Sequence, residues 1–165
     1  MAAISEPSVQ SLLIEMHFNN QKLSSGTAFV AQSAAGPVLV TNRHNVTGRN
    51  QDTGQPLSST GGIPDRLAIV HNRTGRLGQW LPKFENLYAG DRPRWKEHPA
   101  LGARADFVAL PLTDLDDVAL YPYNTANVGP AIAVGPADTV SVIGFPFGMT
   151  VGGALGVWAT GFLAS

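Results

Sequence analysis

The chain has 165 residues, which fits one compact domain or a large part of a bigger protein. With 11 basic and 12 acidic side chains its net charge is −1, so the composition gives no basic footprint for nucleic acid or an anionic membrane. There are no cysteines, which excludes a disulfide scaffold, thiol catalysis and cysteine-ligated metal sites. Apolar residues make up 44% of the chain, and 18 glycines and 12 prolines indicate a globular protein with many turns.

The N-terminal stretch MAAISEPSVQSLLIEM lacks the features of a secretory signal. It contains no lysine or arginine, it carries Glu6 and Glu15, and its only apolar run is short. With no export signal in view, a cytoplasmic location is the default expectation.

Period-two alternation of apolar and polar residues dominates the first half of the chain and favours strands over helices. A first strand is predicted at Gln10–Phe18. Two short apolar runs, Thr27–Ala31 and Pro37–Thr41, are joined by QSAAG and predict a hairpin. The stretch RLAIVHNRTGRLGQWLP predicts a second hairpin with its turn at residues 72–75. A polar, glycine-rich loop is predicted at residues 45–64.

The second half of the chain predicts fewer strands and longer connections. A loop at residues 90–104 precedes a buried strand at Phe107–Leu112, which Pro111 brings to an end. Residues 113–135 are rich in turn formers, and two further strands are predicted at Thr139–Phe145 and Gly156–Ala164. Short strands punctuated by glycine and proline predict an all-β barrel or sandwich.

Residues 139–165 carry no charge, and about 20 apolar residues are enough to span a bilayer. However, glycines and Pro146 interrupt the segment, and its valines and threonines favour strands. We therefore predict two buried strands around a glycine-rich turn here, and no membrane span.

Two polar residues stand at the ends of predicted strands. In GTAFVAQSAAGPVLVTNRHNVTG the hairpin places His44 just past its second strand, and in RADFVALPL Asp106 opens an apolar strand. Taken singly, His44 suits a surface loop and Asp106 a capped strand start. A general base, however, needs an imidazole whose tautomer and orientation are fixed by a third group, which a partly buried aspartate provides. We therefore expect the two side chains to meet within one barrel.

The motifs GTAFV, VLVTNRHNV and ADFVALPL resemble, in this order, the N-terminal motifs of trypsin-like (chymotrypsin-fold) serine peptidases. The stretches RWKEHPALGARADFVALPL and VSVIGFPFGMTVGGALGVWATGFLAS resemble a bacterial branch of that family, and the resemblance runs from Ser11 to the last residue. It implies that His44 is the general base and Asp106 its orienting carboxylate. His71 and His98 do not stand at the motif's base position, and Asn45 occupies a place where many animal members carry a half-cystine.

The nucleophile of that family has no counterpart in this sequence. The family places its serine in a G-x-S-G turn after the aspartate, whereas only Ser141 and Ser165 follow Asp106 here, the first inside a predicted strand and the second at the last residue. The similar-looking stretch SSTGG at residues 58–62 precedes Asp106. The resemblance therefore predicts the N-terminal portion of a trypsin-like double β-barrel. Its parts are a complete first barrel at 1–120, a connector at 121–138, and the opening hairpin of a second barrel at 139–165.

The implied function is that of a serine endopeptidase, which hydrolyses peptide bonds through an acyl-enzyme. His44 would take the proton from a serine outside this sequence, so the 165-residue chain alone is expected to be inactive. The expected partner is a peptide or protein substrate, with no nucleic acid and no membrane. No metal or cofactor is implied, because the four histidines show no paired ligand spacing. The alternative is a non-catalytic binding or scaffold module on the same fold, since a fold does not fix a function.

Overall fold

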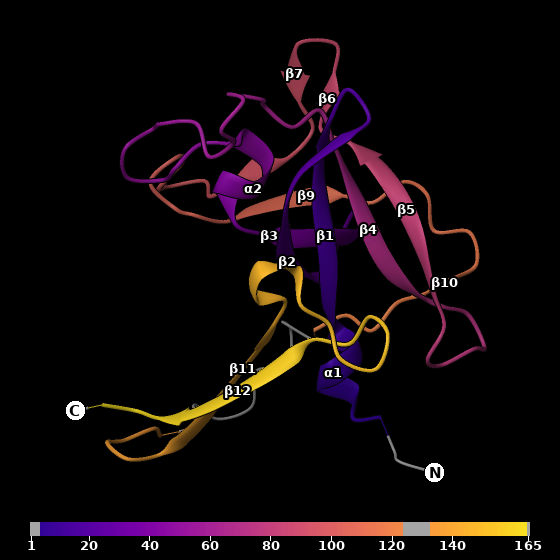
Figure 1. The fold of residues 1–165 in the computed structure, drawn as a ribbon, viewed down its shortest axis with the longest axis vertical. Coiled ribbons are helices and arrows are strands. Elements are labelled where there is room, and N and C mark those ends of the chain that lie inside the picture. Colours follow the sequence, from indigo (N-terminus) through magenta and orange to yellow (C-terminus); the bar gives the residue numbers. More distant parts are fainter. Residues whose placement is uncertain (1–3, 124–132, 165) are drawn as a thin grey trace.

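The computed structural model describes residues 4–123 and 133–164 (Figure 1). Strands account for 48% of the structure and helices for 9%, which confirms the all-β class. The expected connector at 121–138 lies in part outside the described residues, as does Ser165 at the end of the expected hairpin.

One large antiparallel sheet forms most of the body. Its main strands are β1 (Ser11–Phe18), β2 (Gln21–Ser33), β3 (Gly36–Thr41), β4 (Arg66–Arg73), β5 (Trp80–Asn86), β8 (Lys96–Glu97), β9 (Val108–Pro111) and β10 (Val118–Ala119). The hydrogen-bonded order is β10-β4-β1-β2-β3-β9-β8, and β5 pairs with residues 66–72 of β4 in addition. Within residues 4–123 the two end strands of this order, β10 and β8, do not pair with each other. The structure therefore shows a large open antiparallel sheet and no closed barrel among these residues.

The core lies on one face of this sheet and follows from the period-two pattern of the sequence. Its members are apolar side chains of consecutive strands that point to the same side: Leu12, Ile14, Met16, Ala28, Val30, Leu39, Leu67, Ile69, Val108 and Leu110, with Val46, Leu87 and Trp95 from the connections. Burial of each large aliphatic side chain contributes about 1.5–3 kcal/mol, which makes this the main stabilisation of the sheet.

The second predicted hairpin forms, but its turn differs from the expectation. β4 continues through Arg73, and the turn occupies residues 74–79, with Gly75 and Gly78 at φ 64° and 87°. Asn72 stays in the strand because its buried side-chain amide donates a hydrogen bond of 2.9 Å to the Val9 carbonyl. The preference of asparagine for turns is thus overridden by a tertiary contact.

The two predicted loops also contain short regular elements. The segment at 45–64 begins inside a one-turn helix, α2 (Arg43–Thr47), which ends at Gly48 in the left-handed conformation. The segment at 90–104 contributes the two-residue strands β7 (Arg92–Pro93), which pairs with β6 (Tyr88–Ala89), and β8. A further one-turn helix, α1 (Glu6–Gln10), precedes β1.

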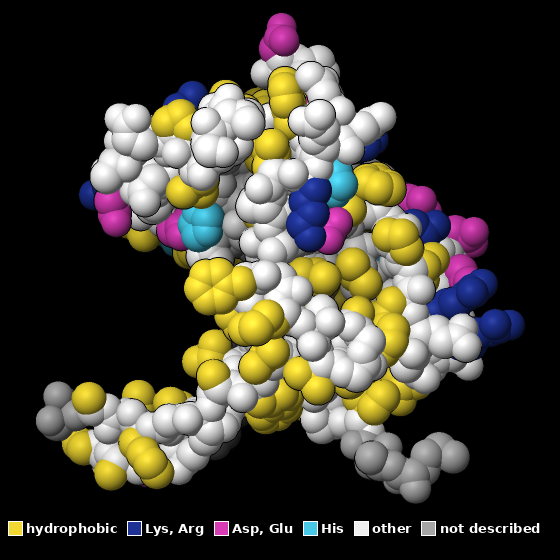
Figure 2. Space-filling model, viewed as in Figure 1, with side chains coloured by type: hydrophobic (Ala, Val, Ile, Leu, Met, Phe, Trp, Pro, Cys, Tyr) yellow, Lys and Arg dark blue, Asp and Glu magenta, His cyan; other side chains and the backbone are white. Residues whose placement is uncertain are grey.

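The last strands, β11 (Thr139–Gly144) and β12 (Val157–Phe162), form the predicted hairpin, which projects from the body as a separate two-stranded sheet (Figure 1). Near its base lies η1 (Pro146–Gly148), and the buried Phe145 donates a backbone hydrogen bond of 2.9 Å to Thr27 Oγ1. The expectation that both strands are buried is wrong: Val142 is 69% exposed and Phe162 is 75% exposed. The apolar side chains of this arm are visible in Figure 2.

Among the described residues, no helix has the length and apolar character needed to cross a bilayer.

We expect the isolated 165-residue chain to self-associate through the β11–β12 hairpin. An uncharged two-stranded sheet with exposed apolar side chains and free edges is a template for pairing with another strand. In sedimentation velocity, the average mass should rise with concentration, and Val142→Lys together with Phe162→Lys should restore the monomer. The control is Leu77→Lys in the β4–β5 turn, which removes an apolar side chain that is 56% exposed elsewhere on the molecule. A wild-type chain that stays monomeric at all concentrations contradicts this expectation.

His71 makes the stability of the fold depend on pH. The side chain is 1% exposed on β4, and neither ring nitrogen has a hydrogen-bond partner within the part of the chain that the structure describes. The pKa of His71 is lowered from 6.5 to about 4, chiefly by burial; the charge of Lys83 contributes to the lowering, while the charges of Glu85 and Asp114 oppose it. The unfolded chain therefore binds a proton at a pH at which the folded chain does not.

The free energy of unfolding therefore falls as the pH falls from about 6.5 to about 4. Above pH 6.5, His71 does not contribute to the pH dependence of the free energy of unfolding. The shift corresponds to about 3 kcal/mol in the free energy of unfolding. Urea unfolding at a series of pH values measures it, and His71→Leu should flatten the profile between these limits. An equally steep profile in His71→Leu would assign the acid sensitivity to other groups.

Candidate functional site

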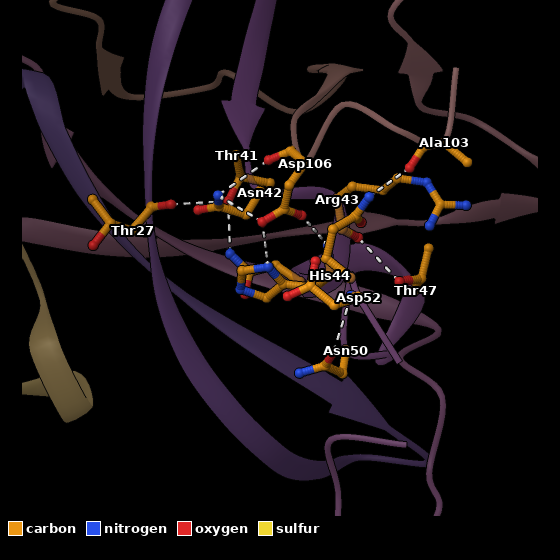
Figure 3. Close-up of polar contacts among 12 residues, drawn as sticks. Thr27, Thr41, Asn42, Arg43, His44, Thr47, Asn50, Asp52, Ala103 and Asp106 are labelled. Atoms are coloured by element: carbon orange, nitrogen blue, oxygen red, sulfur yellow. Dashed lines mark hydrogen bonds and ion pairs between the residues drawn. The ribbon is translucent and has the colours of Figure 1, made fainter. Parts of the chain in front are cut away.

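His44 and Asp106 lie in direct contact, although they come from different parts of the sheet (Figure 3). The ring nitrogen Nδ1 of His44 donates a hydrogen bond of 2.7 Å to Oδ2 of Asp106. The backbone N–H of His44 donates a second bond of 3.0 Å to Oδ1 of the same carboxylate. Because an ionised carboxylate only accepts hydrogen bonds, the arrangement places the imidazole proton on Nδ1. Nε2 is left with its lone pair available for a proton.

The local backbone explains why His44 faces this way. β3 ends at Thr41, and the chain turns at once into α2, whose second residue is His44. Gly48 closes the turn at φ 65°, and its N–H donates a bond of 2.9 Å to the His44 carbonyl. A side chain at Gly48 would meet Pro64 within 2.6 Å, so this position requires glycine for both its conformation and its space. The histidine is therefore carried on a short, tightly closed turn at the end of a core strand.

Asp106 reaches the histidine from the segment that leads into β9. Asn42 donates two hydrogen bonds from its side-chain amide, 3.1 Å to the Asp106 carbonyl and 3.2 Å to Oδ2. Two further contacts tie this segment to the region around α2: Arg43 forms an ion pair of 2.9 Å with Glu97, and Gln51 donates to the Ala103 carbonyl. β3 and β9 pair directly beside the site, so the two partners are held at neighbouring strand ends.

The pair is partly open to solvent, with side-chain exposures of 34% for His44 and 30% for Asp106. The imidazole borders a shallow pocket that is largely uncharged. Its other lining residues are Leu23, Ser24, Asn45, Gly48, Leu57, Ser58, Gly62 and Pro64. No hydrogen bond joins His44 Nε2 to a serine hydroxyl within residues 4–123 and 133–164. A substrate or a further group can therefore approach this side of the ring.

Two linked side-chain hydrogen bonds, which the sequence analysis did not predict, lie next to the turn that carries His44. Asn45 donates 2.9 Å to Thr41 Oγ1, and Thr41 donates 2.8 Å to the Thr27 carbonyl. A Cβ at Gly26 would come within 2.8 Å of the Asn45 amide, so any larger residue there would displace the Asn45 side chain. Asn45 thus links α2 to β3 directly, and to β2 through Thr41.

The other three histidines lie away from Asp106. His71 is buried in β4, and His17 lies in β1 beside Glu15, at 3.4 Å. His98 accepts backbone hydrogen bonds from Ala100 and Leu101 through Nδ1. These placements agree with the expectation that His44 alone pairs with Asp106. Across the described residues, no group of three or more His, Asp or Glu side chains is arranged to hold a metal ion.

No family model, curated protein or solved structure matches this chain. An imidazole with its proton fixed on Nδ1 and its Nε2 open can accept a proton from a hydroxyl or a water molecule, and can later return it.

Proposed function

We propose that this chain carries the general-base half of a serine endopeptidase site on a trypsin-like double β-barrel. The observation that carries the proposal is the 2.7 Å hydrogen bond between His44 Nδ1 and Asp106 Oδ2, with Nε2 left open. In this role Nε2 takes the proton of a serine hydroxyl as it attacks a peptide carbonyl, and then gives it to the leaving amine. Asp106 keeps the ring in the required tautomer and stabilises the imidazolium.

The double-barrel architecture is supported by two features of the sheet. The path β4-β1-β2-β3-β9 is a continuous antiparallel sheet with one buried face, as a first barrel requires. An apolar groove lies where the β11–β12 hairpin meets the body, lined by Thr27, Val142, Gly144, Phe145, Pro146, Val157 and Ala159. Further strands of a second barrel would pack into this groove and cover the exposed hairpin.

The nucleophile, in this proposal, is a serine beyond residue 165, and the substrate is a peptide or protein. The absence of a serine hydroxyl bonded to His44 among the described residues also suits the alternative, a non-catalytic binding module. The coding sequence that continues from Ser165 distinguishes the peptidase from the binding module. A G-x-S-G turn there supports the peptidase, and a stop codon contradicts it.

Peptide hydrolysis tests the proposal in three proteins: the 165-residue chain, a chain continued along its reading frame, and its His44→Ala variant. Of these three proteins, only the continued wild-type chain should hydrolyse casein or a peptide ester above background, because the nucleophile and the oxyanion hole lie in the continuation. His17→Gln serves as the control, since His17 lies on β1 and does not contact Asp106. Equal activity in the continued wild type and His44→Ala would overturn the mechanism.

A further inference from the structure

Asn42 binds both the carboxylate and the backbone carbonyl of Asp106. Its amide donates to the Asp106 carbonyl at 3.1 Å and to Oδ2 at 3.2 Å, the oxygen that also accepts from His44 Nδ1. Oδ1 accepts from the His44 N–H. The carboxylate is therefore held by three donors from a single stretch of three residues, 42–44.

The position of Asn42 makes this arrangement unusual. Asn42 is the N-cap residue of α2, where an asparagine side chain ordinarily accepts a hydrogen bond from the second or third N–H of its own helix. Here the side chain makes no such bond, and Asp106 Oδ1 takes the N–H of the second helical residue, His44. Asp106 thus accepts the N–H that an N-cap side chain would ordinarily accept, while the side-chain NH2 group of Asn42 donates to the same aspartate.

We infer that Asn42 is a positioning residue for the His44–Asp106 pair. By fixing Oδ2 against rotation, it keeps that oxygen aimed at Nδ1 and keeps the imidazole in the tautomer with its proton on Nδ1. The pair is thereby assembled by residues of the turn between β3 and α2 and of the segment that precedes β9. The catalytic meaning of this inference rests on the proposed function, but its test does not require turnover.

Nitrogen-15 NMR of the His44 ring in the 165-residue chain provides the test. The ring nitrogen shifts report the tautomer, and the Nδ1–H signal reports how fast that proton exchanges with water. Asn42→Ser removes the contacts to Asp106 but keeps a good N-cap residue, so it separates positioning from helix capping. Asn42→Ala also removes these contacts, and it leaves no side-chain oxygen that could cap α2. Asn50→Ala is the matched control, because Asn50 also makes two side-chain hydrogen bonds in an exposed loop, to Asp52 and Thr53.

Both Asn42 variants should exchange the His44 Nδ1 proton about tenfold faster than wild type, as expected for loss of a hydrogen bond to a charged acceptor. The neutral ring should also lose its preference for the Nδ1–H tautomer. Asn50→Ala should match wild type. A wild-type tautomer and exchange rate in folded Asn42→Ser would overturn the inference. A change that occurs only in Asn42→Ala would assign the effect to helix capping, and would overturn it as well.

A second readout separates this inference from the proposed function. In a continued chain that hydrolyses peptides, Asn42→Ser should lower kcat and leave KM unchanged. Hydrolysis that is insensitive to Asn42→Ser leaves the peptidase in place and contradicts the positioning role. Altered NMR signals in a continued chain without hydrolysis support the positioning role and contradict the peptidase.

Discussion

Replacing Asp106 by asparagine in the continued chain should lower kcat by about 10⁴-fold, with little change in KM. The neutral amide can donate to Nδ1, which would move the ring proton to Nε2 and leave no lone pair to accept the proton of the nucleophile. The substitution preserves the shape of the side chain and the position of Oδ1, which accepts the His44 N–H at 3.0 Å. The loss should therefore come from the tautomer and the missing charge, without unfolding.

The matched control is Asp117→Asn. Asp117 is also an exposed carboxylate bonded to a basic side chain, Arg73, at 2.6 Å, and asparagine tolerates its positive φ of 58°. This variant should keep full activity. Peptide-ester hydrolysis and circular dichroism on both variants complete the comparison. An Asp106→Asn variant that retains more than about a tenth of the activity would show that His44 does not depend on this carboxylate.

The largest effect on stability is expected at Glu85, whose side chain is 1% exposed. Its carboxylate accepts hydrogen bonds from the backbone N–H groups of Thr113 and Asp114, from the Thr113 hydroxyl at 2.8 Å, and from Arg94 at 3.2 Å. Glu85→Ala leaves these donors without their acceptor and leaves the Arg94 charge without its partner. The free energy of unfolding should fall by about 3–5 kcal/mol, as it does when one member of a buried ion pair is removed.

The comparison variant is Glu97→Ala, which removes a more exposed ion pair with Arg43 and should cost less than about 1 kcal/mol. Glu85→Gln should fall between the two, because its amide oxygen still accepts from one or two of the donors. Urea unfolding gives all three values. Equal losses for Glu85→Ala and Glu97→Ala would mean that the buried carboxylate contributes no more than an exposed one.

The strands of the body could be predicted from the sequence because each carries its own signal. The alternation in β1 and the apolar run in β9 are local patterns, and one face of each strand enters the same core. The turn after β4 could not be placed, because the deciding contact joins Asn72 to the distant Val9 in α1. The exposure of β11 and β12 was also missed, since an uncharged strand has the same sequence whether or not another strand covers it.

The contact between His44 and Asp106 was predictable from their positions at two strand ends together with the family resemblance. Asn42 was not, although asparagine just before a helix is a recognised signal for an N-cap. The sequence predicts that such a side chain bonds its own helix, and only the position of Asp106 shows that it bonds a carboxylate instead. Asn45 was missed for a related reason, because its partner Thr41 is buried only once β2 and β3 have paired.

Acylation of the continued chain shows whether His44 activates a serine nucleophile. An activated peptide ester should add one acyl group per molecule in an initial burst, and mass spectrometry should place that group on a serine beyond residue 165. The burst should be lost in His44→Ala and kept in His17→Gln, since only His44 is paired with Asp106. Absence of an acyl group in the wild type, or acylation at the same rate in His44→Ala, would contradict the account and leave a binding module as the function of the fold.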